Sequence, residues 1–169
     1  MVIKMIKLLV CDVDGTLTDG AIVFEGTSGE HKSFSVKDGL ILKLLPKLGI
    51  DVLFLTGRSS EAVARRASDL GATAIQGVDD KVGVLGALMA ERSLTAEECA
   101  YIGDDFNDYA AMKLCGFKAC PADAVDEIKG ICDYVSCFPG GYGAVRNICE
   151  HLLENDGKYG EFLKCYGIG

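Results

Sequence analysis

The stretch that decides the fold is Leu8–Thr18, which reads LLVCDVDGTLT. Its first four residues are apolar, and a short apolar run that ends at a turn signal is typical of a buried strand in a parallel sheet. Asp12 and Asp14 therefore follow the carboxyl end of that strand, where open α/β sheets bind their ligands. Two neighbouring carboxylates repel each other unless a cation or a shared proton offsets their charge. A magnesium site with oxygen ligands is one interpretation, and an ordinary surface turn of Asp and Gly is the other.

The rest of the chain alternates predicted strands with predicted helices, which is the pattern of a doubly wound parallel sheet in the α/β class. A β-hairpin is predicted at about residues 20–36, with strands at 22–24 and 32–36. Pro46 is expected to shorten the first helix, and Gly71 to cap the second. The other predicted strands cover residues 6–11, 51–55, 74–76, 100–102, 117–120 and 134–135. The predicted helices cover residues 40–48, 60–70, 80–92, 109–114, 124–130 and 144–153, before a glycine-rich tail at about 157–169.

The composition is that of one globular domain spanning residues 1–169, with 49% hydrophobic and 25% charged residues. A net charge of −8 and a pI near 4.7 argue against nucleic acid and acidic membrane surfaces as partners. No apolar run approaches the about 18 residues of a membrane span, and no signal-peptide pattern is found, so a cytoplasmic location is expected. The eight cysteines lack the spacing of a zinc site and are expected to be reduced and mostly buried.

Polar residues recur at the ends of three predicted strands. Thr56 follows the strand at 51–55, and an acidic group follows the strand at 100–102. Because the carboxyl ends of parallel strands share one rim of the sheet, these side chains should meet Asp12 and Asp14 there. So many carboxylates in one place require a divalent cation, and Mg²⁺ suits oxygen ligands. The acidic group consists of Asp104, Asp105 and Asp108.

Two basic residues near these strand ends suit an anion. Arg58 can bind a phosphate through two parallel hydrogen bonds, while Lys81 offers a point charge. A cation beside an anion pocket and an exposed carboxylate describes the transfer of a phosphoryl group to aspartate. Asp12 would be the nucleophile, and Asp14 would protonate the leaving oxygen and then activate the hydrolytic water.

The order of these motifs resembles that of the haloacid dehalogenase superfamily. The matching residues are Asp12–Thr16 (DVDGT), Thr56, Lys81 and Gly103–Asp108 (GDDFND). The resemblance implies that Asp12 is the nucleophile, that Asp14 is the acid/base, and that Thr56 and Lys81 hold the phosphate. It also implies a Mg²⁺ ion bound by the Asp12 carboxylate, the Asp14 backbone carbonyl and Asp104. Asp105 and Asp108 would lie near the metal, directly or through water.

Many members of that superfamily carry an inserted cap domain. The stretches 15–49 and 58–81 leave no room for one, so a capless enzyme is expected. An open site of this kind needs a large substrate or a neighbouring subunit to cover it. The apolar residues of the tail are expected to pack somewhere, and a neighbour's active-site mouth is one hypothesis. These residues are Tyr159, Phe162, Leu163, Tyr166 and Ile168.

Within the superfamily, four segments indicate a more specific group of enzymes. They lie at residues 11–20, 34–39, 55–58 and 140–146. They are similar to the 3-deoxy-D-manno-octulosonate 8-phosphate phosphatases and to relatives acting on nine-carbon sialic-type acid phosphates, including domains fused to acylneuraminate cytidylyltransferases. The resemblance implies a phosphatase for a phosphorylated 2-keto-3-deoxy sugar acid, and a homotetramer whose hairpins build the interface. The sugar-acid site would be lined by Val36, Lys37, Asp38, Gly39, Lys43, Gly57, Arg58 and Arg66.

The chain departs from that pattern at a few positions, so the particular sugar acid stays open. Lys37, Lys43 and Tyr142 stand where the family often has Arg, and Thr16 where it often has Val. Two other functions are possible, namely a phospho-accepting receiver-like signalling domain and a non-catalytic assembly domain of a cytidylyltransferase. Receivers place the lysine last, whereas here Lys81 precedes the acidic group at Asp104. Rapid Mg²⁺-dependent phosphate release would separate the phosphatase from both.

Overall fold

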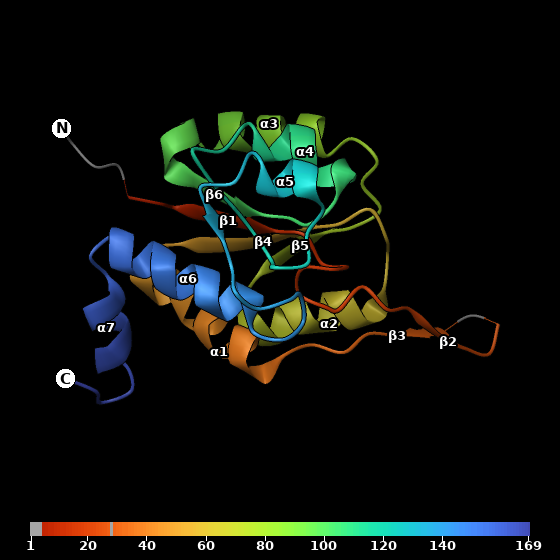
Figure 1. Cartoon of the computed structure of the whole chain (residues 1–169), viewed down its shortest axis with the longest axis horizontal. Helices are drawn as coiled ribbons and strands as arrows, with labels where there is room; N and C mark the ends of the chain where they lie inside the picture. Colours follow the sequence, from red (N-terminus) through yellow and green to blue (C-terminus); the bar gives the residue numbers. More distant parts are fainter. Residues whose placement is uncertain (1–4, 28) are drawn as a thin grey trace.

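The computed structural model describes residues 5–27 and 29–169 and is built around a six-stranded parallel sheet (Figure 1). The strand order is β5-β4-β1-β6-β7-β8, so the chain winds outward from β1 in one direction and then in the other. This arrangement confirms the predicted doubly wound sheet. The strands are β1 (Leu8–Cys11), β4 (Asp51–Leu55), β5 (Thr73–Ile75), β6 (Cys99–Ile102), β7 (Phe117–Cys120) and β8 (Tyr134–Val135).

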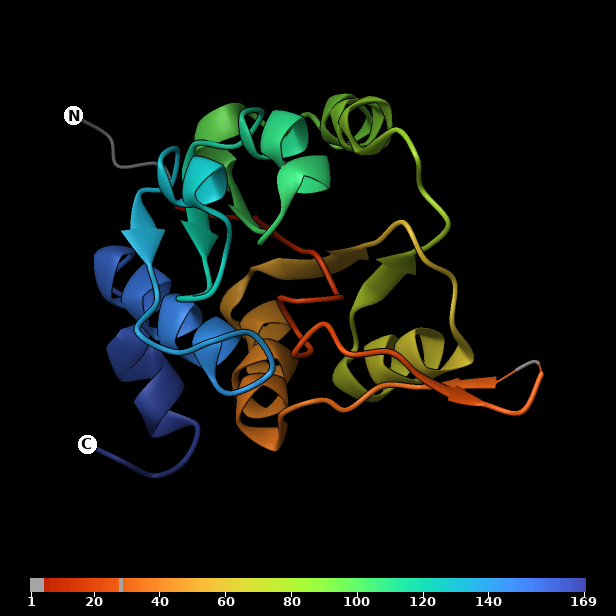
Figure 2. The same ribbon diagram turned by 45° about the vertical axis from the view of Figure 1, so that its right-hand side comes forward.

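Helices cover both faces of the sheet (Figures 1 and 2). On one face lie α1 (Val36–Leu44), α2 (Glu61–Leu70), α6 (Ala144–Asn155) and α7 (Tyr159–Lys164). On the other lie α3 (Lys81–Glu91), α4 (Phe106–Met112) and α5 (Asp126–Lys129). Because side chains alternate along a strand, β1 contributes to a core on each face of the sheet. Leu9 and Cys11 join the core under α1, α2, α6 and α7, and Leu8 and Val10 join the core under α3, α4 and α5.

Local signals set several element ends as predicted. The Ser60 hydroxyl accepts a hydrogen bond from the Ala62 N–H at 3.2 Å and starts α2, and Gly71 ends it with a φ of 68°. Near Pro46 the first helix gives way to a 3₁₀ turn, Leu45–Leu48, because proline has no N–H to continue the α-helical ladder.

The hairpin differs from its prediction. Its strands are β2 (Val23–Glu25) and β3 (Gly29–His31), and they project from the body of the molecule (Figure 2). The second strand was expected at 32–36, but Ser35 caps α1, whose first residue is Val36 instead of Leu40. Likewise α4 begins at Phe106, three residues before its predicted start, because Asp105 forms a capping box with Asp108.

The glycine-rich tail contains a helix that the sequence analysis does not predict, α7. Phe162 of this helix is buried in the same core as α1 and α6, and Tyr159 and Leu163 pack against that core. The spacing of these apolar residues is helical, although the glycines around them hide it. The tail thus packs largely on its own subunit, and the neighbour's active-site mouth remains a hypothesis for Tyr166 and Ile168 only.

All eight cysteines are unpaired, as expected, and five of them are buried. Among the described residues, no helix is long and apolar enough to cross a membrane. No domain is inserted between the elements of the described ranges, which agrees with the prediction of a capless enzyme.

Candidate active site

The candidate site lies where the three central strands end. Strand β1 pairs with β4 and with β6 in parallel, so that Cys11 is level with both Phe54 and Ile102. The residues that follow, Asp12, Thr56 and Asp104, therefore leave adjacent strands at the same rim of the sheet, as the sequence predicts. Asp12 and Thr56 are buried.

Three carboxylates converge at this rim. One oxygen from each of Asp12, Asp104 and Asp108 lies within 4.8 Å of the others. Burial and the neighbouring Asp108 raise the pKa of the Asp12 carboxyl well above its usual value, although Lys81 opposes this. Burial and Asp108 likewise raise the pKa of Asp104 to about 6. The group therefore carries more negative charge than its protein surroundings neutralise.

Lys81 is the cation of the cluster. It is the first residue of α3, which Asp80 caps, and it is only 4% exposed. Its Nζ donates to Asp12 Oδ1 and to Asp108 Oδ1, both at 2.8 Å. Burial lowers the pKa of Lys81, but the two carboxylates outweigh it and leave the pKa raised. Lys81 is thus a fixed positive charge beside the Asp12 carboxylate.

Asp108 organises this cluster from within the protein. Its Oδ1 also accepts a hydrogen bond from the Tyr101 hydroxyl at 2.8 Å, and its Oδ2 accepts one from the Asp104 N–H at 3.1 Å. Tyr101 was missed by the sequence analysis, because it lies inside an apolar strand and is indistinguishable there from a core residue. Asp105, in contrast, is exposed and caps α4, so the structure does not bring it into the acidic group.

The loop after β1 is tightly braced. The N–H groups of Thr16, Leu17 and Thr18 all donate to the Val13 carbonyl, at 2.9–3.2 Å. The Thr16 hydroxyl donates to Asp104 Oδ1 at 3.0 Å and so joins this loop to the end of β6. Gly15 has a φ of 89°, and a Cβ there would lie 2.0 Å from Asp104 Oδ2, so only glycine fits.

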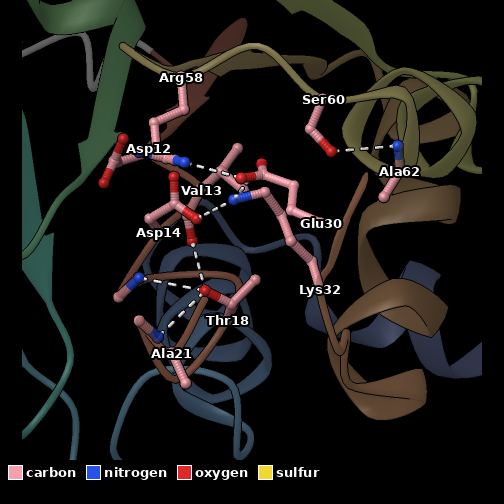
Figure 3. Close-up of polar contacts among 12 residues, drawn as sticks. Asp12, Val13, Asp14, Thr18, Ala21, Glu30, Lys32, Arg58, Ser60 and Ala62 are labelled. Carbon is pink, nitrogen blue, oxygen red and sulfur yellow. Dashed lines mark hydrogen bonds and ion pairs between the residues drawn. The ribbon is translucent and has the colours of Figure 1, made fainter. Parts of the chain in front are cut away.

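Asp14 meets the hairpin instead of the acidic group (Figure 3). Its carboxylate contacts the ammonium of Lys32, which also lies 3.4 Å from Glu30 Oε1. Glu30 Oε2 in turn accepts a hydrogen bond from Arg58 Nη2 at 2.7 Å. Arg58 is therefore near Asp14, as predicted, with Gly57 in the same turn. Lys32 and Glu30 were missed because the hairpin is offset from its prediction: β3 ends at His31, whereas the second strand was predicted to begin at Lys32.

Most of the predicted sugar-acid residues lie elsewhere. A groove of about 590 Å³ between α1 and α2 is lined by Val36, Gly39, Lys43 and Arg66, together with Leu40 and Tyr166 among others, and by none of the site's aspartates. Within it Arg66 donates to the Ser35 carbonyl at 3.1 Å. Lys37 is exposed at the start of α1, and its carbonyl faces Arg146.

Asp38 is buried and faces α6. Its Oδ1 accepts a hydrogen bond at 2.8 Å from the N–H of Arg146, in the first turn of that helix, while its Oδ2 has no partner. Burial raises its pKa to about 6 although the Arg146 N–H and Arg66 lower it. The structure therefore places Asp38 at the contact between α1 and α6, and its contact with a sugar acid stays a prediction.

The chain is similar to known phosphatases over nearly its whole length. A haloacid dehalogenase-like hydrolase family model matches residues 75–138. The 3-deoxy-D-manno-octulosonate 8-phosphate phosphatase of Haemophilus influenzae is 38% identical over 98% of this chain and 93% of that protein. The chain belongs to this phosphatase family.

Solved structures of the family share the fold. The enzyme from Moraxella catarrhalis, in complex with magnesium ion, phosphate ion and the sugar acid KDO, is 40% identical, with a TM-score of 0.91 over 96% of this chain and 94% of that one. The cobalt-bound enzyme from H. influenzae is 38% identical, with a TM-score of 0.88 over 95% of this chain and 94% of that one.

Family membership confirms the resemblance drawn from the motifs and makes the chain a phosphoric monoester hydrolase. A receiver-like signalling domain is therefore not supported. The acidic group of Asp12, Asp104 and Asp108 fits Mg²⁺ as the cofactor, because crowded carboxylates with raised pKa values are what a divalent cation offsets.

Proposed function

We propose that this chain hydrolyses a phosphorylated 2-keto-3-deoxy sugar acid, 3-deoxy-D-manno-octulosonate 8-phosphate or a nine-carbon sialic-type 9-phosphate, through an aspartyl-phosphate intermediate. The observation that carries the proposal is the buried Asp12 carboxylate, which lies beside Asp104 and is held by Lys81 at 2.8 Å. The nucleophile Asp12, the metal-binding carboxylate of Asp104 and the cation Lys81 then lie side by side at the rim of the sheet.

The first half of the reaction uses Asp12 as the nucleophile. Its free oxygen attacks phosphorus, while Lys81 and the Thr56 hydroxyl stabilise charge on the phosphoryl oxygens. When bound, Mg²⁺ screens the repulsion between carboxylate and phosphate, and Asp12, Asp104 and the Asp14 carbonyl are the groups that would hold it. Asp108 is assigned to orienting Lys81, since its oxygens already accept bonds from Lys81, Tyr101 and the Asp104 N–H.

The second aspartate of the motif, Asp14, transfers protons. Asp14 donates a proton to the leaving oxygen of the sugar and later removes one from the water that hydrolyses the intermediate. Its place at the outer side of the β1 loop, beside Arg58 and the hairpin, is where the leaving sugar would lie. Arg58 is the cation nearest to that position and suits the carboxylate of a sugar acid.

We further propose that residues 1–169 form one phosphatase unit that works in the cytoplasm as a homotetramer. The predicted sugar-acid residues Lys43 and Arg66 lie in the α1–α2 groove, apart from the aspartates of the same chain. A neighbouring copy could bring such a groove to the open site. Val23 and Phe24 of the hairpin are 58% and 74% exposed, which favours an interface there.

A phosphate-release assay tests the proposed reaction. With Mg²⁺ present, the protein should release phosphate from octulosonate 8-phosphate or a nonulosonate 9-phosphate faster than from hexose phosphates. EDTA should abolish turnover, and added Mg²⁺ should restore it. Asp12→Asn should lower kcat by at least about a thousandfold with the fold intact. Near-normal activity of that variant, or no Mg²⁺-dependent release from any of these esters, would contradict the proposal and favour a non-catalytic assembly domain.

A further inference from the structure

Lys32 is a buried cation with no role in the proposed reaction as described above. It follows strand β3 of the hairpin, and its side chain is 0% exposed. Its ammonium contacts the carboxylate of Asp14 and lies 3.4 Å from Glu30 Oε1 (Figure 3). An ammonium withdrawn from water is stable only where anions compensate its lost hydration, and Asp14 is the closer of the two.

The contact between Lys32 and Asp14 joins the hairpin to the loop after β1, which belong to different sheets. Strands β2 and β3 form a separate two-stranded sheet, while Asp14 belongs to the loop that leaves β1 in the main sheet. Glu30 extends the connection to Arg58, after β4, at 2.7 Å. Charges therefore alternate along Asp14, Lys32, Glu30 and Arg58, so that each side chain is held by the next.

We propose that Lys32 is a positioning residue for the acid/base Asp14, and that the hairpin acts on the chemistry through it. The inference rests on the proposed function, in which Asp14 transfers protons to and from oxygen. The carboxylate of Asp14 is partly exposed and has side-chain torsions of its own, and a charged hydrogen bond to a fully buried partner restricts them. Lys32 thereby aims the carboxylate without contacting the phosphate.

This role predicts a particular kinetic pattern. Loss of the ammonium should slow both proton transfers, so kcat should fall. The KM of the sugar-acid phosphate and the affinity for Mg²⁺ should hardly change, because Lys81 and the carboxylates of Asp12 and Asp104 stay in place. A residue that binds the sugar acid would instead raise KM, and a purely structural residue would lower the melting temperature without a selective effect on kcat.

The test compares Lys32→Met with Lys7→Met, which removes a lysine from the ion pair with Glu98, outside the site. We expect Lys32→Met to lower kcat at least tenfold with KM within twofold of the unchanged protein, and Lys7→Met to leave both constants as they are. Lys32→Arg, which keeps the charge, should retain most of kcat. In Lys32→Ala, added ethylammonium should restore part of kcat, whereas tetramethylammonium, which has no N–H to donate, should not.

Each outcome decides the inference separately from the proposed function. If the unchanged protein shows no Mg²⁺-dependent phosphatase activity, the proposed function fails. If it is active and Lys32→Met has a normal kcat, or a raised KM alone, the positioning role is overturned. If Lys32→Met does not fold, Lys32→Arg and the ethylammonium experiment decide, and a folded Lys32→Ala protein that ethylammonium leaves inactive also overturns it.

Discussion

At the scale of single residues, the Lys81 ammonium is the contact that holds two buried carboxylates, Asp12 and Asp108, in one cluster. Lys81→Met would leave both without their cation, and breaking a buried ion pair costs about 3–5 kcal/mol. We expect the free energy of unfolding in the absence of Mg²⁺ to fall by about that amount. Urea titration measures the change, and Asp108→Asn added to Lys81→Met should recover part of it. If the two substitutions instead lowered the free energy of unfolding additively, Lys81 and Asp108 would not be coupled in one cluster.

Asp38 makes a second prediction, on the pH dependence of stability. Its pKa in the folded protein is about 6, above the ordinary 3.8, so the folded state keeps a proton that the unfolded state releases between those values. Ionisation of Asp38 therefore costs stability as the pH rises through this window, by up to about 3 kcal/mol. Asp38→Asn removes that cost while its amide oxygen still accepts from the Arg146 N–H.

The measurement is the free energy of unfolding of Asp38→Asn minus that of the unchanged protein. This difference should grow from pH 4 to pH 7, because only the unchanged protein loses stability through Asp38. Using the difference removes the effect of the other titrating groups, which both proteins share. A difference independent of pH would show that Asp38 has an ordinary pKa.

Residues of the site differ in how far the sequence could identify them. Asp12, Thr56 and Asp104 could be predicted because apolar runs mark the strands, and parallel strands end at one rim. Tyr101 could not, since its hydroxyl reaches Asp108 from within an apolar strand. Lys32 could not either, because its contact with Asp14 depends on how the hairpin folds over the loop, which no local pattern encodes.

At the scale of elements, the segment before α6 braces the loop after β1. Gly141 N–H donates to the Thr16 carbonyl at 3.2 Å, and a Cβ at Gly140 would lie 1.9 Å from the Gly15 carbonyl oxygen. Gly140→Ala must therefore displace the backbone next to Asp14. We expect kcat to fall at least tenfold in a phosphate-release assay.

The matched control is Gly86→Ala on α3, where an added Cβ meets nothing within 4 Å. This change should leave kcat unaltered and stabilise the helix by up to about 1 kcal/mol, since alanine favours helices over glycine. Equal kcat values for the two alanine variants would show that the segment before α6 does not set the position of the loop.

The predicted bounds of strands and helices differ in how well they agree with the structure. Strand β4 was predicted to the residue, because its buried apolar run, Val52–Leu55, follows Asp51 and ends before the Thr56–Gly57 turn. The starts of α1 and α4 were missed, since the caps Ser35 and Asp105 stand before stretches with low helix propensity or with expected site residues. Helix α7 was missed because glycines interrupt its apolar spacing.

At the scale of the whole molecule, the exposed hairpin predicts assembly. If the protein is the proposed tetramer, Phe24→Ser should shift its sedimentation coefficient toward smaller species, since it removes a ring that is 74% exposed in the single chain. Phe106→Ser on α4, which removes a ring that is 62% exposed, should leave assembly unchanged. Identical sedimentation of the unchanged protein and the Phe24 variant would exclude the hairpin as the interface.

The place of β1 in the sheet has a consequence for how the molecule opens. The strand is bonded on both edges, to β4 and β6, whereas β5 and β8 stand at the margins of the sheet. Local opening starts at such margins, so the amide hydrogens of Leu9–Cys11 should exchange with solvent only when the entire sheet opens. The strand that presents the nucleophile is then among the last parts to lose its structure on heating.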